Sequence, residues 1–142
     1  MNFQRVLLKL SGEALAGANG FGFDAQVMSG YAKSIADAAT TGTQIAIVIG
    51  GGNIYRGEQG AQTGKWRVKG DQMGMLATVI NGLALAETFE KEHCATQVFS
   101  AFPTGPVATP YSVEGVEEAL TQQKVAILTA GTGNPFFTTD SA

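Results

Sequence analysis

Three consecutive glycines at positions 50–52 are the first residues whose type and placement indicate chemistry. They follow residues 45–49, a run of mostly β-branched apolar residues that predicts a strand buried on both faces. Because glycine has no Cβ, a glycine turn after such a strand lets backbone N–H groups converge on an anion. Arg56 follows closely enough to bring a bidentate guanidinium to the same anion. A phosphate site and a plain strand-to-helix turn with a solvated Arg56 both remain open on this stretch alone.

Lys9 is a second cation at the end of an expected strand. Residues 6–10 form a short apolar run that Lys9 interrupts and that Ser11 and Gly12 follow, which predicts a buried strand ending in a turn. An ammonium group beside a buried strand requires an anionic partner. The alternative is an edge strand with Lys9 directed to water.

A third strand and turn occupy the end of the sequence. Residues 125–129 predict a strand, and residues 130–142 supply glycines, hydroxyls and amides. Alternating strands and helices indicate a parallel sheet, in which the carboxyl ends of the strands share one edge. We therefore expect the three turns to meet at that edge in a single anion-receiving site. The polar residues 138–141 are of helix N-cap type with no helix after them, so the sequence looks cut off there.

The elements between these turns are predicted by capping residues and helical spacing. Asp24 is a suitable N-cap for a helix that ends at Gly42, with an apolar face of Val27, Tyr31, Ile35 and Ala38. A longer helix is expected from Asp71 to about Glu92, with Met75, Val79, Leu83 and Ala86 on one face and Leu76, Ile80 and Phe89 beside them. In that reading Asp71 could simply cap the helix. Residues 96–99 predict another strand, and Ser112 is expected to cap a helix reaching about Gln122.

Composition and missing motifs narrow the possible functions. The chain has 142 residues, a net charge of −3 and a sequence pI of about 5.0, so nucleic acid is not an expected partner. It shows no apolar run of the roughly 18 residues that a membrane span needs. One cysteine, Cys94, and one histidine, His93, argue against disulfides, a metal cluster and a Ser-His-Asp triad, and favour the cytoplasm. The glycines satisfy neither the Walker A pattern nor the dinucleotide fingerprint, so a redox Rossmann protein is disfavoured.

Four segments carry a resemblance to a known family. Residues 9–13 (KLSGE), 49–53 (IGGGN) with Arg56, 70–75 (GDQMGM) and 132–140 (TGNPFFTTD) together closely resemble the bacterial uridylate kinases of the amino acid kinase family. The resemblance covers the chain from end to end, and the 132–140 segment is far more specific than the glycine turns. It implies an α/β fold with a mostly parallel sheet and helices on both faces, and phosphoryl transfer from Mg²⁺-ATP to UMP to give UDP in the cytoplasm.

The resemblance also implies a role for particular residues. The implied ATP contacts are Lys9, Leu10, Ser11, Gly12, Gly52 and Arg56. The implied UMP contacts are Gly51, Asp71, Thr132, Gly133, Asn134, Pro135, Phe136, Phe137, Thr138 and Thr139. Lys9 and Arg56 would neutralise charge during transfer, and Asp140 would orient Lys9 or a metal-bound water. A loop linked to GTP activation is matched by Gly17, Ala18, Asn19, Gly20, Phe21 and Gly22.

The family pattern also sets expectations about assembly and extent. It implies a homohexamer, with the helix over residues 71–92 as a candidate contact. Family members continue into a second part that supplies the adenine and ribose pocket, so residues 1–142 are expected to be the N-terminal, UMP-binding part. Two alternatives stay open: a non-catalytic nucleotide- or oxyanion-binding protein of the same fold, and a kinase of the family that acts on a carboxylate. Asp71 argues against the second, because it would repel an acidic substrate.

Overall fold

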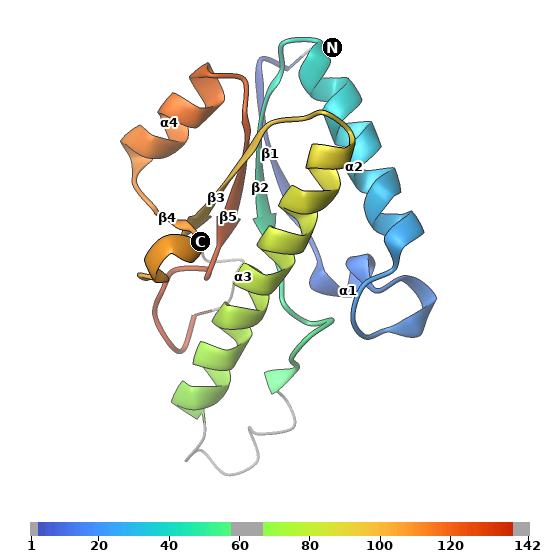
Figure 1. Cartoon of the computed structure of the whole chain (residues 1–142). Coiled ribbons are helices and arrows are strands. Elements are labelled where there is room, and N and C mark those ends of the chain that lie inside the picture. Colours follow the sequence, from blue (N-terminus) through green and yellow to red (C-terminus); the bar gives the residue numbers. More distant parts are fainter. Residues whose placement is uncertain (1–2, 58–66, 138–142) are drawn as a thin grey trace.

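A single sheet of five parallel strands forms the centre of the molecule (Figure 1). The computed structural model describes residues 3–57 and 67–137. Its strands are β1 (Arg5–Leu10), β2 (Gln44–Ile49), β3 (Thr96–Ser100), β4 (Thr109–Pro110) and β5 (Val125–Thr129), in the spatial order β1-β2-β5-β3-β4. Each neighbouring pair is parallel, so the carboxyl ends share one edge, at the bottom of Figure 1. The expected α/β fold with a mostly parallel sheet is confirmed.

The strands β2 and β5 are largely buried, whereas β1 is not. Residues 45–49 of β2 are all buried, as the sequence predicted, and β5 lies between β2 and β3. Within the described residues β1 pairs with β2 alone, and its side chains alternate between exposed and partly buried. Lys9 is on the exposed face and β1 lies at the edge of the described sheet, so the expectation of a strand buried on both faces is wrong at this position. Alternation of this kind is what a strand covered on one face shows.

Helices cover both faces of the sheet. The helices α2 (Ala25–Thr40) and α3 (Arg67–Lys91) lie side by side on one face, and α4 (Val113–Thr121) lies on the other (Figure 1). The predicted caps are confirmed: Asp24 accepts hydrogen bonds from the N–H groups of Gln26 and Val27, and Ser112 Oγ accepts one from Gly115. Short helical turns are α1 (Gly12–Leu15), η1 (Gly17–Asn19) and η4 (Gly105–Val107).

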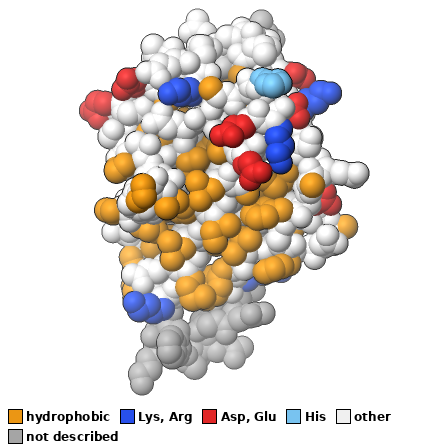
Figure 2. All heavy atoms as spheres, in the orientation of Figure 1, with side chains coloured by type: hydrophobic (Ala, Val, Ile, Leu, Met, Phe, Trp, Pro, Cys, Tyr) orange, Lys and Arg blue, Asp and Glu red, His pale blue; other side chains and the backbone are white. Residues whose placement is uncertain are grey.

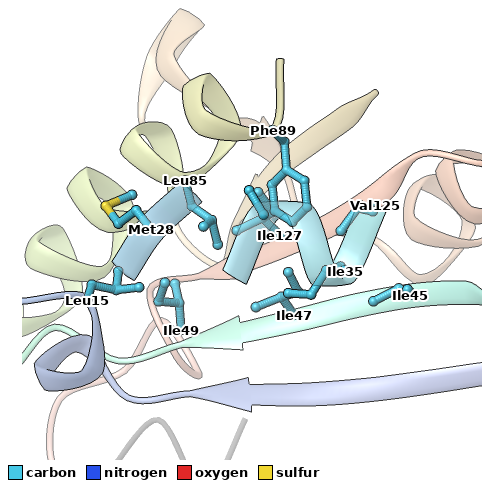
Figure 3. Packing of buried hydrophobic residues seen from close by; sticks show 11 residues of the cluster. Leu15, Met28, Ile35, Ile45, Ile47, Ile49, Leu85, Phe89, Val125 and Ile127 are labelled. Carbon is cyan, nitrogen blue, oxygen red and sulfur yellow. The ribbon is translucent and has the colours of Figure 1, made fainter. Parts of the chain in front are cut away.

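The main core lies between the sheet and the α2–α3 layer. Figure 3 shows its side chains meeting from β2, β5, α2 and α3, with Leu15 of α1 closing one end. Its buried members are Leu15, Met28, Ala32, Ile35, Ile45, Ile47, Ile49, Leu85, Phe89, Val125 and Ile127. A smaller cluster under α4 covers the opposite face with Ala46, Phe99, Ala119, Leu120 and Ala126. The larger of the two apolar clusters therefore lies between the sheet and the helices α2 and α3.

The buried face of α3 matches the expected one only in part: Val79 and Phe89 are buried as predicted. The residues that pack inward are Ala77, Thr78, Val79, Asn81, Gly82, Leu85 and Phe89. Leu76, Ile80 and Leu83 are 48%, 46% and 39% exposed, and with Met73 they form an outward stripe on α3. Figure 2 shows that hydrophobic side chains gather over much of this face of the molecule. Small residues face the sheet because α3 lies so close to it: a Cβ at Gly82 would be 2.6 Å from Thr129 Cγ2.

The buried face of α2 is also rotated from the expected one. Met28, Ala32, Ile35 and Ala36 are buried, whereas Ala38 is exposed. The strand over 96–99 is present as β3, and the helix predicted to reach Gln122 ends at Thr121. The two-residue strand β4 has no counterpart in the sequence expectation. No described helix combines the length and apolar character needed to cross a membrane.

An ion pair joins the edge strand to α4. Arg5 donates to both carboxylate oxygens of Glu117, at 2.6 and 2.9 Å. The hydrogen bond from Arg5 lowers the pKa of Glu117 below its ordinary value of 4.5. A depressed carboxyl pKa stabilises the fold above that ordinary value, and the contribution is lost as the pH falls through the lowered pKa. Both side chains are about half exposed, so the effect on stability is small.

Candidate functional site

The three predicted turns lie at the same edge of the sheet. β1, β2 and β5 are parallel neighbours, and each leads at its carboxyl end into a glycine-containing turn. The N–H of Gly50 donates to the Leu10 carbonyl at 2.9 Å, which joins the first turn to the second. Thr78 of α3 accepts a hydrogen bond from the Ala130 N–H at 2.6 Å, which joins α3 to the third. The expected meeting is confirmed for these turns, while Thr138, Thr139 and Asp140 lie outside the described residues.

Because glycine has no side chain, the turns can pack closely against one another and against α3. A Cβ at Gly12 would lie 2.6 Å from Asn53 Oδ1 and 2.7 Å from the Gly50 carbonyl oxygen. A Cβ at Gly51 would lie 2.9 Å from the Gly74 carbonyl oxygen of α3. Real Cβ atoms do not tolerate such distances, so both positions require glycine for close packing.

Arg56 is held beside the glycine turn. Its Nε donates to the Gly52 carbonyl at 3.2 Å, and its NH2 lies 3.4 Å from Oε1 of Glu13 in α1. The side chain is 56% exposed, so the guanidinium remains accessible to a ligand at the turn. Arg56 therefore lies next to the glycine turn, the position that both sequence interpretations gave it.

Asp71 contacts the third turn and does not cap α3. The helix begins at Arg67, one turn earlier than expected, so the capping alternative for Asp71 is wrong. Asp71 Oδ2 instead accepts a hydrogen bond from the Phe136 N–H at 2.7 Å and lies 3.8 Å from Arg67 Nε. The guanidinium of Arg67 also sits 5.0 Å from the centre of the Phe136 ring, in a cation–π contact. A charge-assisted hydrogen bond and this stacking together anchor the loop after β5 to α3.

A cavity of about 230 Å³ unites residues from three segments of the chain. Gly51 and Gly52 come from the turn after β2, Asp71 from α3 and Phe137 from the loop after β5. The remaining lining residues are Tyr55, Gly57, Gly70, Gly74, Met75 and Thr78. The cavity combines turn amides, one carboxylate and an aromatic ring, which suits a ligand with an anionic end, hydroxyl groups and a flat ring.

Other candidate residues lie outside this cavity lining. Thr132 lines a second depression of about 300 Å³ on the α4 face, together with apolar residues such as Phe99 and Leu128. Gly133 has a φ of +74° and packs so close to Ala101 that a Cβ would lie 2.8 Å from its carbonyl oxygen. We place the candidate site in the smaller cavity because it alone of the two holds the glycine turn and Asp71. The other residues of the loop and of the 9–12 segment border the same edge, namely Leu10, Ser11, Asn134 and Pro135.

The loop expected to respond to GTP lies against the glycine turn. It contains η1 and three glycines with positive φ, at positions 17, 20 and 22. Gly22 donates its N–H to the Asn53 carbonyl and accepts a hydrogen bond from Asn53 Nδ2, both at 2.9 Å. Phe21 at its tip is 70% exposed. The loop is therefore joined to the turn at one residue.

Sequence reasoning missed two buried asparagines behind the turn. Asn53 and Asn81 are 0% exposed and bond to each other: Asn81 Nδ2 donates to Asn53 Oδ1 at 2.7 Å, and Asn53 Nδ2 donates to Asn81 Oδ1 at 3.1 Å. Polar groups buried in this way require partners. The sequence did carry one indication of this pair: Asn81 is an amide residue in the middle of an otherwise apolar helix pattern.

The ionisable groups elsewhere do not form a second site in the described part of the chain. Burial raises the pKa of the Cys94 thiol, in keeping with its expected apolar role. No described group of three or more His, Cys, Asp or Glu side chains could hold a metal ion.

Comparison with known proteins places this geometry in a family. The model of the amino acid kinase family matches residues 4–142. The chain belongs to the amino acid kinase family. Proteins named uridylate kinase in Serratia proteamaculans and Yersinia pestis are each 50% identical to it over 140 residues, or 99% of this chain and 58% of theirs.

Solved structures agree with that assignment. The chain is similar to a UMP kinase of Bacillus anthracis, with a TM-score of 0.91, 36% identity and coverage of 99% of this chain and 58% of that one. A UMP kinase of Ureaplasma parvum gives a TM-score of 0.89 at 35% identity, covering 97% of this chain and 61% of that one. The fold is thus that of the amino acid kinases, and the chain spans a little under two-thirds of the length of these relatives.

Proposed function

We propose that this chain is the UMP-binding part of a nucleoside monophosphate kinase that transfers the γ-phosphoryl group of ATP to UMP and gives UDP. The cavity that joins Gly51, Asp71 and Phe137 supports this proposal most directly, because three separate segments supply it. The proposed UMP phosphate lies at the glycine turn, and Asp71 accepts hydrogen bonds from the ribose hydroxyls. The names of the relatives, uridylate kinase and UMP kinase, support the choice of nucleotide.

The proposed reaction requires positioning and charge neutralisation. An oxygen of the UMP phosphate bonds to the γ-phosphorus of ATP while the bond from that phosphorus to the bridging oxygen breaks, and ADP leaves. Lys9 and Arg56 would offset the negative charge shared by the two nucleotides, and Asp140 would orient Lys9. Arg56 contacts the turn through the Gly52 carbonyl, which supports its proposed role. The reaction would serve de novo pyrimidine nucleotide synthesis in the cytoplasm.

Mg²⁺ is proposed to enter with ATP. The described residues offer no cluster of three acidic or imidazole side chains, so the ion would rely on phosphate oxygens and water for most of its ligands. That mode of binding is usual for Mg²⁺ in kinases, where it offsets phosphate charge. The adenine and ribose pocket is proposed to lie in the further length that the relatives have. Activation by GTP through residues 17–22 is part of the same proposal.

Replacing Arg56 with lysine should weaken nucleotide binding. A planar fork that can grip a phosphate at two points becomes a single ammonium, so we expect about a tenfold loss of affinity, or about 1.4 kcal/mol. Isothermal titration with UMP and with ATP measures the change. Arg5→Lys is the matched control, because Arg5 pairs with Glu117 at the amino end of β1. Equal affinities in wild type and Arg56→Lys would show that Arg56 is not a phosphate ligand.

The outward stripe of α3 is proposed as a contact between copies of this chain, within a homohexamer. Its members Met73, Leu76, Ile80 and Leu83 present a continuous apolar surface on one helix face (Figure 2). Light scattering after size exclusion should give a multiple of the 14.7 kDa chain mass. Leu76→Glu with Ile80→Glu should reduce that multiple, whereas Val107→Glu, at a 49% exposed site elsewhere, should not. A monomeric wild type would refute the proposed contact.

Binding and turnover can be tested separately. We expect isothermal titration to detect UMP binding by this chain, with N-acetylglutamate failing to compete. Release of ADP from ATP in the presence of UMP, followed by a coupled assay, tests the transfer itself. The assay is run on this chain and on a version extended past Ala142, because the proposed adenine and ribose pocket lies in the further length of the relatives. UMP binding without ADP release from either protein would favour the non-catalytic nucleotide-binding alternative. Absence of UMP binding would overturn the proposal.

A further inference from the structure

The buried amide of Asn81 holds the first peptide unit of the glycine turn. Asn81 Nδ2 donates to the Gly50 carbonyl at 2.6 Å and, with its other hydrogen, to Asn53 Oδ1 at 2.7 Å. In a trans peptide the carbonyl and the following N–H lie in one plane and point in opposite directions. Fixing the Gly50 carbonyl against Asn81 therefore fixes the direction of the Gly51 N–H, which points away from Asn81.

The other carbonyls of the turn are also occupied. The Gly51 carbonyl accepts hydrogen bonds from the N–H groups of Ile54 and Tyr55, both at 3.0 Å, and the Gly52 carbonyl accepts one from Arg56. Each carbonyl of residues 50–52 thus accepts a hydrogen bond, and this bond fixes the plane of its peptide unit. Asn81 supplies the only one of these from a distant element, α3, since the rest come from within six residues of the turn.

Asn53 keeps Asn81 in place. Its side chain is as deeply buried as that of Asn81, and its two amide hydrogens go to the Gly22 carbonyl and to Asn81 Oδ1. Each of the four amide hydrogens of the pair therefore has an acceptor within 3.1 Å. A fully satisfied polar pair in a water-excluded interior holds its members in one arrangement.

We propose that Asn81 is a positioning residue: supported by Asn53, it sets the direction of the Gly51 N–H that receives the phosphate of the bound nucleotide. The inference rests on the proposed function for the identity of that ligand. The role of Asn81 in orienting the Gly50 peptide is inferred from the hydrogen bonds alone. The orientation and the identity of the ligand can therefore be tested, and refuted, separately. Asn81 acts through the backbone and does not itself contact UMP.

The test compares variants of Asn81 with a matched control on the same helix. Asn81→Ala removes both donors, and Asn81→Asp keeps the shape but replaces the donor to Gly50 with a carboxylate. Thr88→Val is the control, because the hydrogen bond from Thr88 Oγ1 to the Ala84 carbonyl, at 2.8 Å, is internal to α3. Should Asn81→Ala fail to fold, Asn81→Asp carries the test. Binding is measured with UMP and with uridine, which lacks the phosphate.

We expect both Asn81 variants to weaken UMP binding about tenfold, the size of one hydrogen bond of about 1.4 kcal/mol, and to change uridine binding less than twofold. Thr88→Val should leave the ratio of the two affinities unchanged even where it lowers Tm. An equal loss for UMP and uridine would overturn the inference, because general destabilisation affects both.

Amide resonances in ligand-free ¹⁵N spectra give a second measurement. The Gly51 resonance should move in both Asn81 variants and stay in place in Thr88→Val. If the wild type binds no UMP, the proposed function fails, and this resonance still decides whether Asn81 sets the turn. An unmoved Gly51 resonance in Asn81→Ala would overturn the inference whatever the wild type binds.

Discussion

Replacing Gly12 with alanine is expected to cost about 1–3 kcal/mol of folding free energy and to abolish binding at the glycine turn. The added Cβ would lie 2.6 Å from Asn53 Oδ1, 2.7 Å from the Gly50 carbonyl oxygen and 2.8 Å from the Gly52 nitrogen. Two of these atoms belong to the backbone of the turn and the third to the buried amide pair, so none can move without moving the site. Denaturant unfolding measures the first effect, and UMP titration the second.

Gly30→Ala is the matched control for that substitution. Gly30 lies inside α2, and a Cβ there would meet nothing within 4 Å. Because alanine is the better helix former, Gly30→Ala should raise the free energy of unfolding by up to about 1 kcal/mol and leave ligand binding unchanged. The same chemical change should thus act with opposite sign at the two positions. A Gly12→Ala protein as stable as wild type would contradict the close packing of the first two turns.

Asp71→Asn is expected to weaken UMP binding by about 10- to 100-fold, because hydrogen bonds to a charged acceptor contribute roughly 1.5–3 kcal/mol. The isosteric amide keeps the size of the side chain but loses the charge that attracts Arg67 and that strengthens hydrogen bonds from the ribose hydroxyls. Its remaining oxygen can still accept from the Phe136 N–H, so the loop anchor should be weakened less than the ligand contact. Isothermal titration measures the affinity.

Glu87→Gln is the control for the loss of a negative charge on α3. Glu87 pairs with Lys91 at 3.4 Å on a surface where both side chains are more than two-thirds exposed. Exposed pairs of this kind contribute little, so UMP affinity should not change. Equal UMP binding by Asp71→Asn would show that the charge of the carboxylate does not contribute to binding, and tighter binding would show that it repels the nucleotide. Either result would move the ribose contact elsewhere.

Much of the layout could be predicted because it depends on local signals. Residues 45–49 are uniformly apolar and became the buried strand β2, and Asp24 and Ser112 cap helices as their residue types favour. The common edge of the turns followed from the alternation of strands and helices, since parallel strands carry their carboxyl ends together. The family resemblance, through the 132–140 segment, supplied the candidate roles that spacing alone left open.

The errors arose where contacts between distant segments decide the structure. The pattern of α3 placed Leu83 and Leu76 inward, yet a glycine lies at position 82, where the helix approaches β5 too closely for a side chain. Asn81 is buried because it bonds to the turn after β2. Lys9 was assigned to a buried strand because the pattern gives no sign of which strand is at the edge. The role of Asp71 depended on Phe136, which is 65 residues away in the sequence.

The double hydrogen bond between Asn53 and Gly22 has a thermodynamic consequence. Asn53 bonds to Gly22 in the loop over 17–22 and to Asn81, and Asn81 bonds to Gly50 in the turn over 50–52. Any molecule that displaces Gly22 therefore also disturbs the hydrogen bonds that hold Gly50. Linkage is reciprocal: the factor by which a loop ligand changes affinity at the turn must equal the factor by which a turn ligand changes affinity at the loop. A titration performed in both orders would therefore return one coupling constant.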